Sequence, residues 1–217
     1  MPAPTLVVCD SGNTTYAAST LVASQNDIFW SAGDIIVACG FSGGPDTLTF
    51  SSATLSWIPR VTSNTSSTAT IWTAEPSTAG ADTFFMNRTL ADTTGLGATR
   101  YVFSGSGGGR ATASNSNVGL PAASITTTTP HSVIVALDVD TNNGNTAATW
   151  LTNAGTFASY LDDTAGAMDV HNGYHIDVAT IGTYTIGNSA PNSQIYDFVA
   201  FEVTSIPNTT PTAWIGV

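Results

Sequence analysis

The sequence predicts an all-β protein, an antiparallel β-sandwich formed as one domain over residues 1–217. The best polar helix formers are nearly absent, since the chain has no Lys, two Glu and two Gln, whereas its many Thr, Ser, Gly, Asn and Val residues favour strands and turns. Apolar runs with a period of two recur between turn residues, which is typical of a sandwich or barrel. With 42% hydrophobic residues, one large core can form without a metal or a disulfide.

The first half of the chain contains a series of short strand patterns. Residues 1–30 hold two prolines and few apolar residues, and they are expected to form an edge strand or an N-terminal arm. Residues 35–41, IIVACGF, are apolar on both faces, as in a central strand. Further strands are expected at residues 47–50, 55–61, 69–74, 83–87 and 100–103, and a flexible Gly/Ser loop at residues 104–109.

The clearest strand pattern lies at residues 132–140, where aliphatic and small or polar residues alternate. Asn143-Gly144 follows, a pair that favours a two-residue hairpin turn. Such a turn would pair Leu137 with Trp150 and Val139 with Ala148. The sequence therefore predicts a hairpin that places an aromatic side chain over an aliphatic face.

The last third of the chain is expected to add a short segment and three strand regions. Residues 156–161 are ambiguous, with one helical turn as an option. Residues 168–178 contain Asn172-Gly173, a second hairpin signal, and strands are expected at residues 181–186 and 195–203. Residues 204–217 carry two prolines and predict an extended C-terminal tail.

Charge and cysteine content exclude several classes of function. The net charge is −11, the pI is about 4.1, and the four basic residues are scattered arginines, so binding to nucleic acid is disfavoured. No apolar run is long enough to cross a bilayer and no basic export signal begins the chain, so no membrane insertion is expected. Cys9 and Cys39 could form one bridge, but Cys39 lies in an apolar run where a free thiol is favoured.

Four segments carry a resemblance to a known group of proteins. They read GDIIVACGF, LSWIPRV, ATIWTAEPSTAGADTF and GTYTIGNSAPNSQIYDFVAFEV, within residues 33–103 and 182–203. In this order they resemble phage virion proteins that have jelly-roll or lectin-like sandwich domains. The resemblance implies a jelly-roll-like sandwich on a phage particle, and it implies no catalytic residues.

Residues 40–44, GFSGG, form the strongest enzymatic signal. They match the G-x-S-x-G elbow that exposes a nucleophilic serine in α/β-hydrolases, here Ser42. In an α/β-hydrolase the nucleophilic serine is followed along the chain by an acid and then by a histidine. Here Asp138 or Asp140, and then His171 or His175, follow Ser42 in that order. The elbow must lead into a helix, however, and the residues after Ser42 predict a turn and a strand. The sequence therefore favours a Gly-rich connecting loop, and a serine esterase is the third hypothesis.

Two patterns suggest a metal site, and both have simpler explanations. Asp138, Asp140 and Asn142 resemble the start of a calcium loop, but the glycine comes one place late and the twelfth position is not Glu. The spacing of Asp169, His171, His175 and Asp177 suggests a metal site on one strand face. The predicted turn at Asn172-Gly173 separates the two histidines, however, which need not converge. We therefore expect hairpins without metal or cofactor, and a chelator should leave the melting temperature unchanged.

The sequence favours a non-enzymatic structural protein that decorates or cements the exterior of a virion head or tail. Trp214, Ile215 and Val217 make the C-terminal tail unusually apolar, which predicts that it docks either on the protein's own sheet or on a neighbouring subunit or shell protein. The second option is favoured, together with a homo-oligomer, for which a trimer is favoured. The expected partners are the major capsid protein or tail proteins. The alternative is a carbohydrate- or receptor-binding module with a cell-surface glycan as partner, for which exposed tryptophans would be the signal, although burial is favoured for Trp57, Trp72 and Trp150.

Overall fold

The computed structural model describes residues 2–11, 19–23, 27–92, 95–141, 147–163, 168–190 and 192–206. Within these residues all regular structure is antiparallel β-strand and no helix occurs, so none is present that could span a membrane. The predicted fold class, an all-β antiparallel sandwich, is confirmed.

The first half of the chain forms one large sheet and two small ones. The large sheet has the order β1-β10-β4-β7-β6, and the small sheets have the orders β2-β9-β5 and β3-β8. The strands are β1 (Thr5–Ser11), β2 (Ser19–Ala23), β3 (Ile28–Trp30), β4 (Ile35–Ser42), β5 (Leu48–Ser52), β6 (Ile58–Asn64), β7 (Thr68–Ala74), β8 (Gly80–Asp82), β9 (Phe84–Asp92) and β10 (Leu96–Ser104).

The second half repeats this plan. Its large sheet has the order β11-β18-β13-β16-β15 and its small sheet the order β12-β17-β14. The strands are β11 (Ser106–Gly119), β12 (Ala122–Thr126), β13 (Ser132–Asp140), β14 (Thr149–Trp150), β15 (Phe157–Asp163), β16 (Asp169–Val178), β17 (Thr183–Ala190) and β18 (Gln194–Ser205).

Each half pairs its strands from the outside inward. In the first half β1 pairs with β10, β2 with β9, β3 with β8 and β4 with β7; in the second half β11 pairs with β18, β12 with β17 and β13 with β16. Nested pairing of first with last strand is the wrapping of a jelly roll. The chain is therefore a tandem pair of jelly-roll-like units.

The repeat extends to the pairing of individual residues. Ser42, at the end of β4, lies between Leu96 of β10 and Thr68 of β7. Asp140, at the end of β13, lies in the same way between β18 and Asp169 of β16. Ser42 and Asp140 are therefore equivalent positions, as are Thr68 and Asp169.

Even an irregularity is repeated. The register of β6 against β7 shifts between Pro59 and Val61, and the register of β15 against β16 shifts between Ser159 and Leu161. Such bulges bend a strand and are specific features of a fold. Their matching positions show that the two halves share one architecture in detail.

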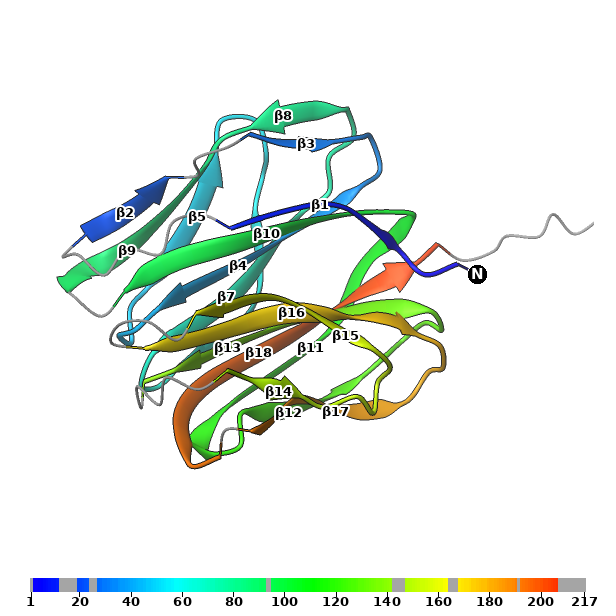
Figure 1. The fold of residues 1–217 in the computed structure, drawn as a ribbon. Coiled ribbons are helices and arrows are strands. Elements are labelled where there is room, and N and C mark those ends of the chain that lie inside the picture. Colours follow the sequence, from blue (N-terminus) through cyan, green and yellow to red (C-terminus); the bar gives the residue numbers. More distant parts are fainter. Residues whose placement is uncertain are drawn as a thin grey trace, which may run out of the picture.

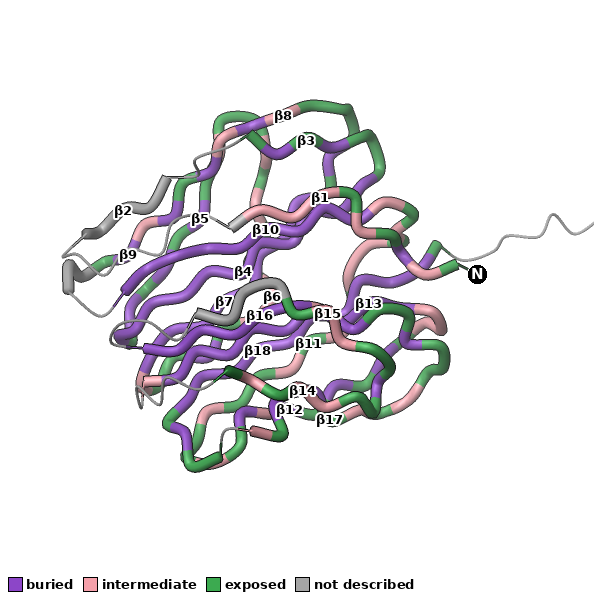
Figure 2. Tube along the Cα trace, viewed as in Figure 1, coloured by how far each residue is buried: buried purple, intermediate pink, exposed green. Residues whose placement is uncertain are grey.

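The two halves stack through their large sheets, with a small sheet covering each outer face (Figure 1). Figure 2 shows that burial is concentrated in the central strands of both halves. The core between the large sheets contains residues of both halves, among them Phe41, Phe103, Leu137 and Phe201. A separate core lies under each cover, around Trp72 in the first half and around Phe198 in the second.

The large sheets contact each other on both sides of the shared core. Tyr101 of β10 donates its hydroxyl to Asn172 Oδ1 of β16 at 2.6 Å, and Phe103 packs edge-on against Tyr174. On the other side β18, the counterpart of β10, contacts β7, the counterpart of β16. The two halves are therefore joined along both sides of the core between the large sheets, with the more extensive contacts on the side of β18 and β7.

Both predicted hairpins are wrong. β13 pairs with β16 and β18, so Leu137 and Val139 do not pair with residues 148–150. Trp150 instead pairs with Asn188 of β17 in the cover. Asn143-Gly144 lies outside the described residues. Asn172-Gly173 is no turn, because both residues lie in the middle of β16.

Three smaller expectations also change. Residues 156–161 contain no helical turn, since β15 begins at Phe157, and the expected loop at residues 104–109 gives way to β11 from Ser106 onward. Of the N-terminal residues 1–30, β1 is an edge strand of the large sheet, as one of the two alternatives predicted. Thr204 and Ser205 of the expected tail belong to β18, and the rest of it beyond Ile206 lies outside the described residues.

Candidate functional site

Ser42 is buried at the end of β4 and is held by charged neighbours. Its Oγ donates to Asp46 Oδ2 at 2.6 Å and accepts from Arg88 Nη1 at 3.3 Å. The Arg88 and Asp46 side chains lie 4.0 Å apart and are fully buried. The chain after Ser42 leads through a loop into β5 instead of a helix. The arrangement fixes a loop and supplies neither a histidine base nor access for a substrate.

The other residues of the possible triad lie in the second half. Asp138 and Asp140 are on β13, and His171 is directly opposite Asp138 on β16. These side chains face the second-half cover, on the opposite outer face of the sandwich from the cover that contributes Arg88. The structure therefore does not bring Ser42 together with an Asp-His pair.

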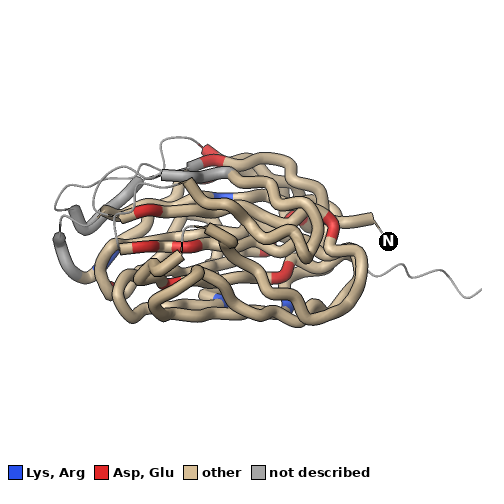
Figure 3. The backbone as a smooth tube through the Cα atoms, turned by 60° about the horizontal axis from the view of Figure 1, so that its bottom comes forward, with Lys and Arg blue, Asp and Glu red and all other residues tan. Residues whose placement is uncertain are grey.

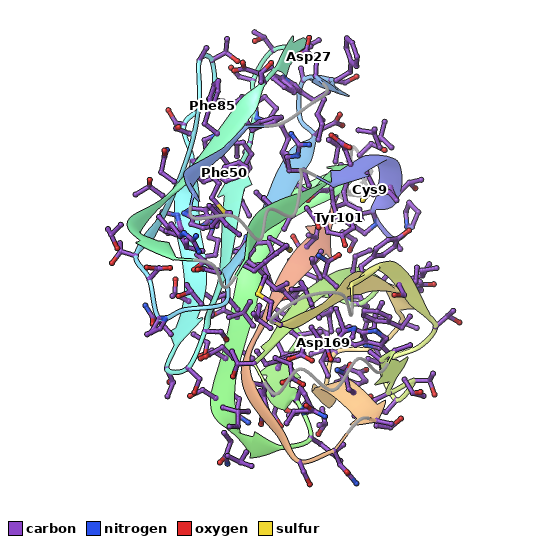
Figure 4. The ribbon with its side chains drawn as sticks, turned by 60° about the vertical axis from the view of Figure 1, so that its left-hand side comes forward. Cys9, Asp27, Phe50, Phe85, Tyr101 and Asp169 are labelled. Carbon is purple, nitrogen blue, oxygen red and sulfur yellow. The ribbon has the colours of Figure 1, made fainter. Side chains whose placement is uncertain are left out.

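A cluster of acidic side chains is buried under the second-half cover. Asp138, Asp140 and Asp169 are fully buried, and Asp169 lies directly opposite Asp140. Asp169 is labelled in the second half in Figure 4. Figure 3 shows how few basic positions the chain has to set against its acidic ones. Three acidic side chains buried side by side require compensation, because an isolated buried charge is very costly.

Asn188 of β17 joins the cover to this acidic cluster. Its Nδ2 donates to Asp138 Oδ2 at 2.8 Å. The other oxygen of Asp138 and Oδ1 of Asn188 are both buried and have no hydrogen-bond partner among the described residues. Burial raises the pKa of Asp138 well above its ordinary value, and the neighbouring Asp140 raises it further.

The structure places the candidate metal ligands in other surroundings than the sequence predicted. Asp138 and Asp140 do not belong to the predicted hairpin, because both are buried in β13, which pairs with β16 and β18. Asn142 lies outside the described residues. Among the described part of the chain, no three His, Cys, Asp or Glu side chains are already arranged around a common metal position.

His171 and His175 are buried in β16 instead of lying on a surface hairpin. His175 Nδ1 is 3.3 Å from the carbonyl oxygen of Gly155, to which a neutral imidazole donates. Burial lowers the pKa of His175 to about 4. This histidine is therefore neutral at physiological pH and serves as part of the packing.

Two further buried acids fasten loops. Asp197 of β18 accepts hydrogen bonds from the turn between β6 and β7, through the backbone N–H groups of Thr65, Ser66 and Ser67 and the hydroxyls of Ser63 and Ser67. Glu202 similarly accepts from Thr128, Thr129 and Ser132. A carboxylate that accepts several N–H and O–H groups is a strong local anchor. Sequence reasoning missed both, because neither lies in a motif.

Two clefts occupy equivalent places in the halves. A cleft of about 380 Å³ lies between residues 54–56 and the segment from Ala74 to Ala81, and a cleft of about 220 Å³ lies between residues 153–155 and the segment from Asp177 to Thr180. In the first, Trp30 Nε1 donates to Thr78 O at 3.0 Å. In the second, the Tyr184 hydroxyl donates to Thr180 O at 2.7 Å. Each cleft thus has an aromatic residue that fastens its loop.

The described tryptophans do not form an exposed platform. Trp30 and Trp72 are buried. Trp57 packs edge-on against Phe50, and Trp150 stacks on Phe157 with ring centroids 3.9 Å apart. The predicted assembly residues Trp214, Ile215 and Val217 lie outside the described residues.

Cys9 and Cys39 form no disulfide with each other. Burial raises the pKa of the Cys39 thiol.

Comparisons with protein-family models, with curated proteins and with solved structures found no match.

Proposed function

We propose that this chain is a non-enzymatic structural protein of a phage virion, which decorates or cements the exterior of the head or tail through protein contacts. The observation that carries the proposal is the doubled jelly roll, since jelly rolls are common in viral capsid and lectin domains. Fold alone does not define function, so the contacts of the buried polar groups must also be considered. Ser42, Asp197 and Glu202 are each committed to holding loops.

Exposed apolar side chains support a role in protein contacts. Phe29 on β3 is 68% exposed. Val118 on β11 is 64% exposed and pairs with the exposed Ile195 of β18. Large exposed apolar side chains that occur next to each other are typical of interaction sites. The partners in this proposal are the major capsid protein or tail proteins and further copies of the same chain, with a trimer as the favoured oligomer.

Removing residues 207–217 tests the assembly role of the tail. If Trp214, Ile215 and Val217 dock on a neighbour, the truncated protein will bind purified particles more weakly and will show a lower solution mass in light scattering. A Val118→Ser variant that keeps the tail is the companion test of the exposed pair. Normal particle binding and unchanged mass in both variants would contradict the proposal.

A carbohydrate- or receptor-binding module is the second candidate, and the paired clefts favour it. Each cleft combines hydroxyl groups and one acid, Glu75 in the first and Asp177 in the second. Such groups can exchange hydrogen bonds with the hydroxyls of a sugar. Titration with neutral oligosaccharides distinguishes this candidate: saturable binding that Glu75→Gln and Asp177→Asn each weaken would favour it.

A further inference from the structure

The strand β11 is an edge of the second-half large sheet, and among the described strands it pairs with β18 alone. With 14 residues it is the longest of these strands, and none of its residues is buried. Its register against β18 shifts before Thr112 and then continues without a shift to Gly119. The side of β11 away from β18, here called the free edge, therefore presents a regular row of backbone groups to which another strand can add.

The pairing of Val118 shows which backbone groups face the free edge. Its partner Ile195 directs its carbonyl oxygen to the other side of β18, where it accepts from Thr141 N at 3.0 Å. The backbone N–H of Val118 therefore points away from β18, and the Asn117 side chain accepts it at 2.8 Å. This direction alternates along a strand. The free edge thus also receives the N–H and C=O groups of the other even-numbered residues of the regular stretch, Thr112, Ser114 and Ser116.

The other three edges of the large sheets carry features that hinder the addition of a strand. β6 contains Pro59 beside a register shift. β15 contains a register shift and ends in Asp162 and Asp163. β1 has only seven residues and a register shift after Leu6. Prolines, bulges, charges and short length are the usual protections of edge strands, and residues 112–119 contain no proline, no charge and no register shift.

The strands next to β11 carry no exposed acid, whereas the whole chain has a net charge of −11. No Asp or Glu occurs in residues 93–137, and β6, which contacts β11 from the facing sheet, contains none. Asp197 and Glu202 of β18 are buried and hold loops. Glu75 lies beside Gly108, at the irregular start of β11. Because two acidic proteins repel each other least where neither surface is acidic, the charge distribution favours a second copy of this chain as the partner of the free edge.

We propose that β11 pairs antiparallel with β11 of a second copy, so that the two second-half large sheets become one continuous sheet across a two-fold axis at Asn115. About this axis the outward-facing groups match: Thr112 lies opposite Val118 of the partner subunit, and Ser114 lies opposite Ser116 of the partner subunit. A two-fold contact uses one surface twice, and the exposed Val118 gains a cross-strand neighbour. The pairing does not depend on the virion function, and it is separate from any contact of the C-terminal tail.

The solution mass of the full chain tests this pairing. Ser114 is exposed, and Ser114→Glu places two like charges at neighbouring positions across the axis, where they are destabilising. Sedimentation should give this variant half the mass of the wild type, whether the tail joins further copies or not. Thr185→Glu adds the same charge to an exposed position of β17 and should leave the mass unchanged.

Ser114→Pro tests the backbone pairing without a change of charge. It removes an N–H that faces the free edge, a position at which an edge strand accepts proline, and it should also halve the mass. Ser114→Ala keeps the N–H and should not. A monomeric wild type, or a mass that neither Ser114→Glu nor Ser114→Pro lowers, would overturn the proposal. A fall to one third would also overturn it and assign the free edge to a ring of three copies. Removal of residues 207–217 tests the tail independently.

Cross-linking locates the axis. In the proposed pairing the two copies of residue 115 lie directly opposite each other, with Cβ atoms about 4.5–5.5 Å apart, which is close to the span of a disulfide. Asn115→Cys should therefore form a cross-linked dimer on mild oxidation. Asn117→Cys lies opposite residue 113 of the partner subunit and should not, and the wild type is the control for Cys9 and Cys39. Equal cross-linking of both variants would overturn the two-fold axis at Asn115.

Discussion

Replacing Asp197 with Ala tests how the two halves are held together. The carboxylate lies on β18 of the second half and accepts five hydrogen bonds of 2.6–3.0 Å from the β6–β7 turn of the first half. Hydrogen bonds to a charged group contribute about 1.5–3 kcal/mol each, but a shared acceptor makes them non-additive. Alanine also leaves the buried Ser67 N–H without its acceptor, and water can reach Thr65 and Ser66 more easily. We therefore expect a loss of about 3–5 kcal/mol.

Urea unfolding measures this loss. With a slope of about 2 kcal/mol/M, the midpoint of Asp197→Ala should fall by about 2 M while the slope stays constant. Asp177→Ala is the control, because its pair with His131 is exposed on both sides and surface pairs contribute about 0–1 kcal/mol. A loss below about 1 kcal/mol for Asp197→Ala would refute the reasoning that this carboxylate joins the halves.

Three further outcomes follow from individual contacts. Burial holds the pKa of His175 at about 4, against 6.5 in the unfolded chain, so the contribution of the neutral imidazole to stability is present above pH 6.5 and is lost as the pH falls toward 4. Urea unfolding should therefore show about 2 kcal/mol less stability at about pH 5 than at neutral pH, and His175→Gln should remove that part of the pH dependence. Gly109→Ala should lower the free energy of unfolding by about 1–3 kcal/mol or more, since a Cβ there would lie 1.8 Å from the Phe201 ring; an unchanged thermal midpoint would contradict the packing. Ser42→Ala should cost about 1–3 kcal/mol by removing the partner of Asp46, and hydrolysis of small activated esters should stay at background in both proteins.

The strands of the two large sheets could be predicted where the pattern of apolar residues in the sequence indicates that one or both faces are buried. The predicted strand regions at residues 35–41, 69–74 and 195–203 all lie within β4, β7 and β18, because the apolar residues there alternate or run continuously. Pairing was not predictable, because nested strands join residues far apart in the chain. A period-two pattern shows that a strand has a buried face and does not show which strand lies beside it.

Asn172-Gly173 shows why a strong turn signal can fail. The Asn172 amide donates to Thr99 and its oxygen accepts from Tyr101, so its polar group is satisfied inside the interface between the halves. Gly173 lies where a Cβ would come within 2.2 Å of the carbonyl oxygen of Ala158. The glycine is needed for close approach of two strands and not for a turn.

The repeat and the acidic cluster were hidden for a related reason. Equivalent positions carry different chemistry, such as Ser42 against Asp140 and Thr68 against Asp169, so the sequence shows no visible repeat. The Asp138-x-Asp140 pattern was visible, but the predicted hairpin explained it without a metal ion. Only the pairing of β13 with both β16 and β18 places these acids in the interior.

Quantitative mass spectrometry of purified virus particles tests the proposed virion role most directly. Particles isolated from the source of this sequence, washed in high salt and digested, should contain this chain in a constant ratio to the major shell protein. Mild protease treatment of intact particles should release its peptides first, because it is placed on the exterior. Absence of the chain from washed particles, with the protein recovered only in the soluble fraction, would contradict the account.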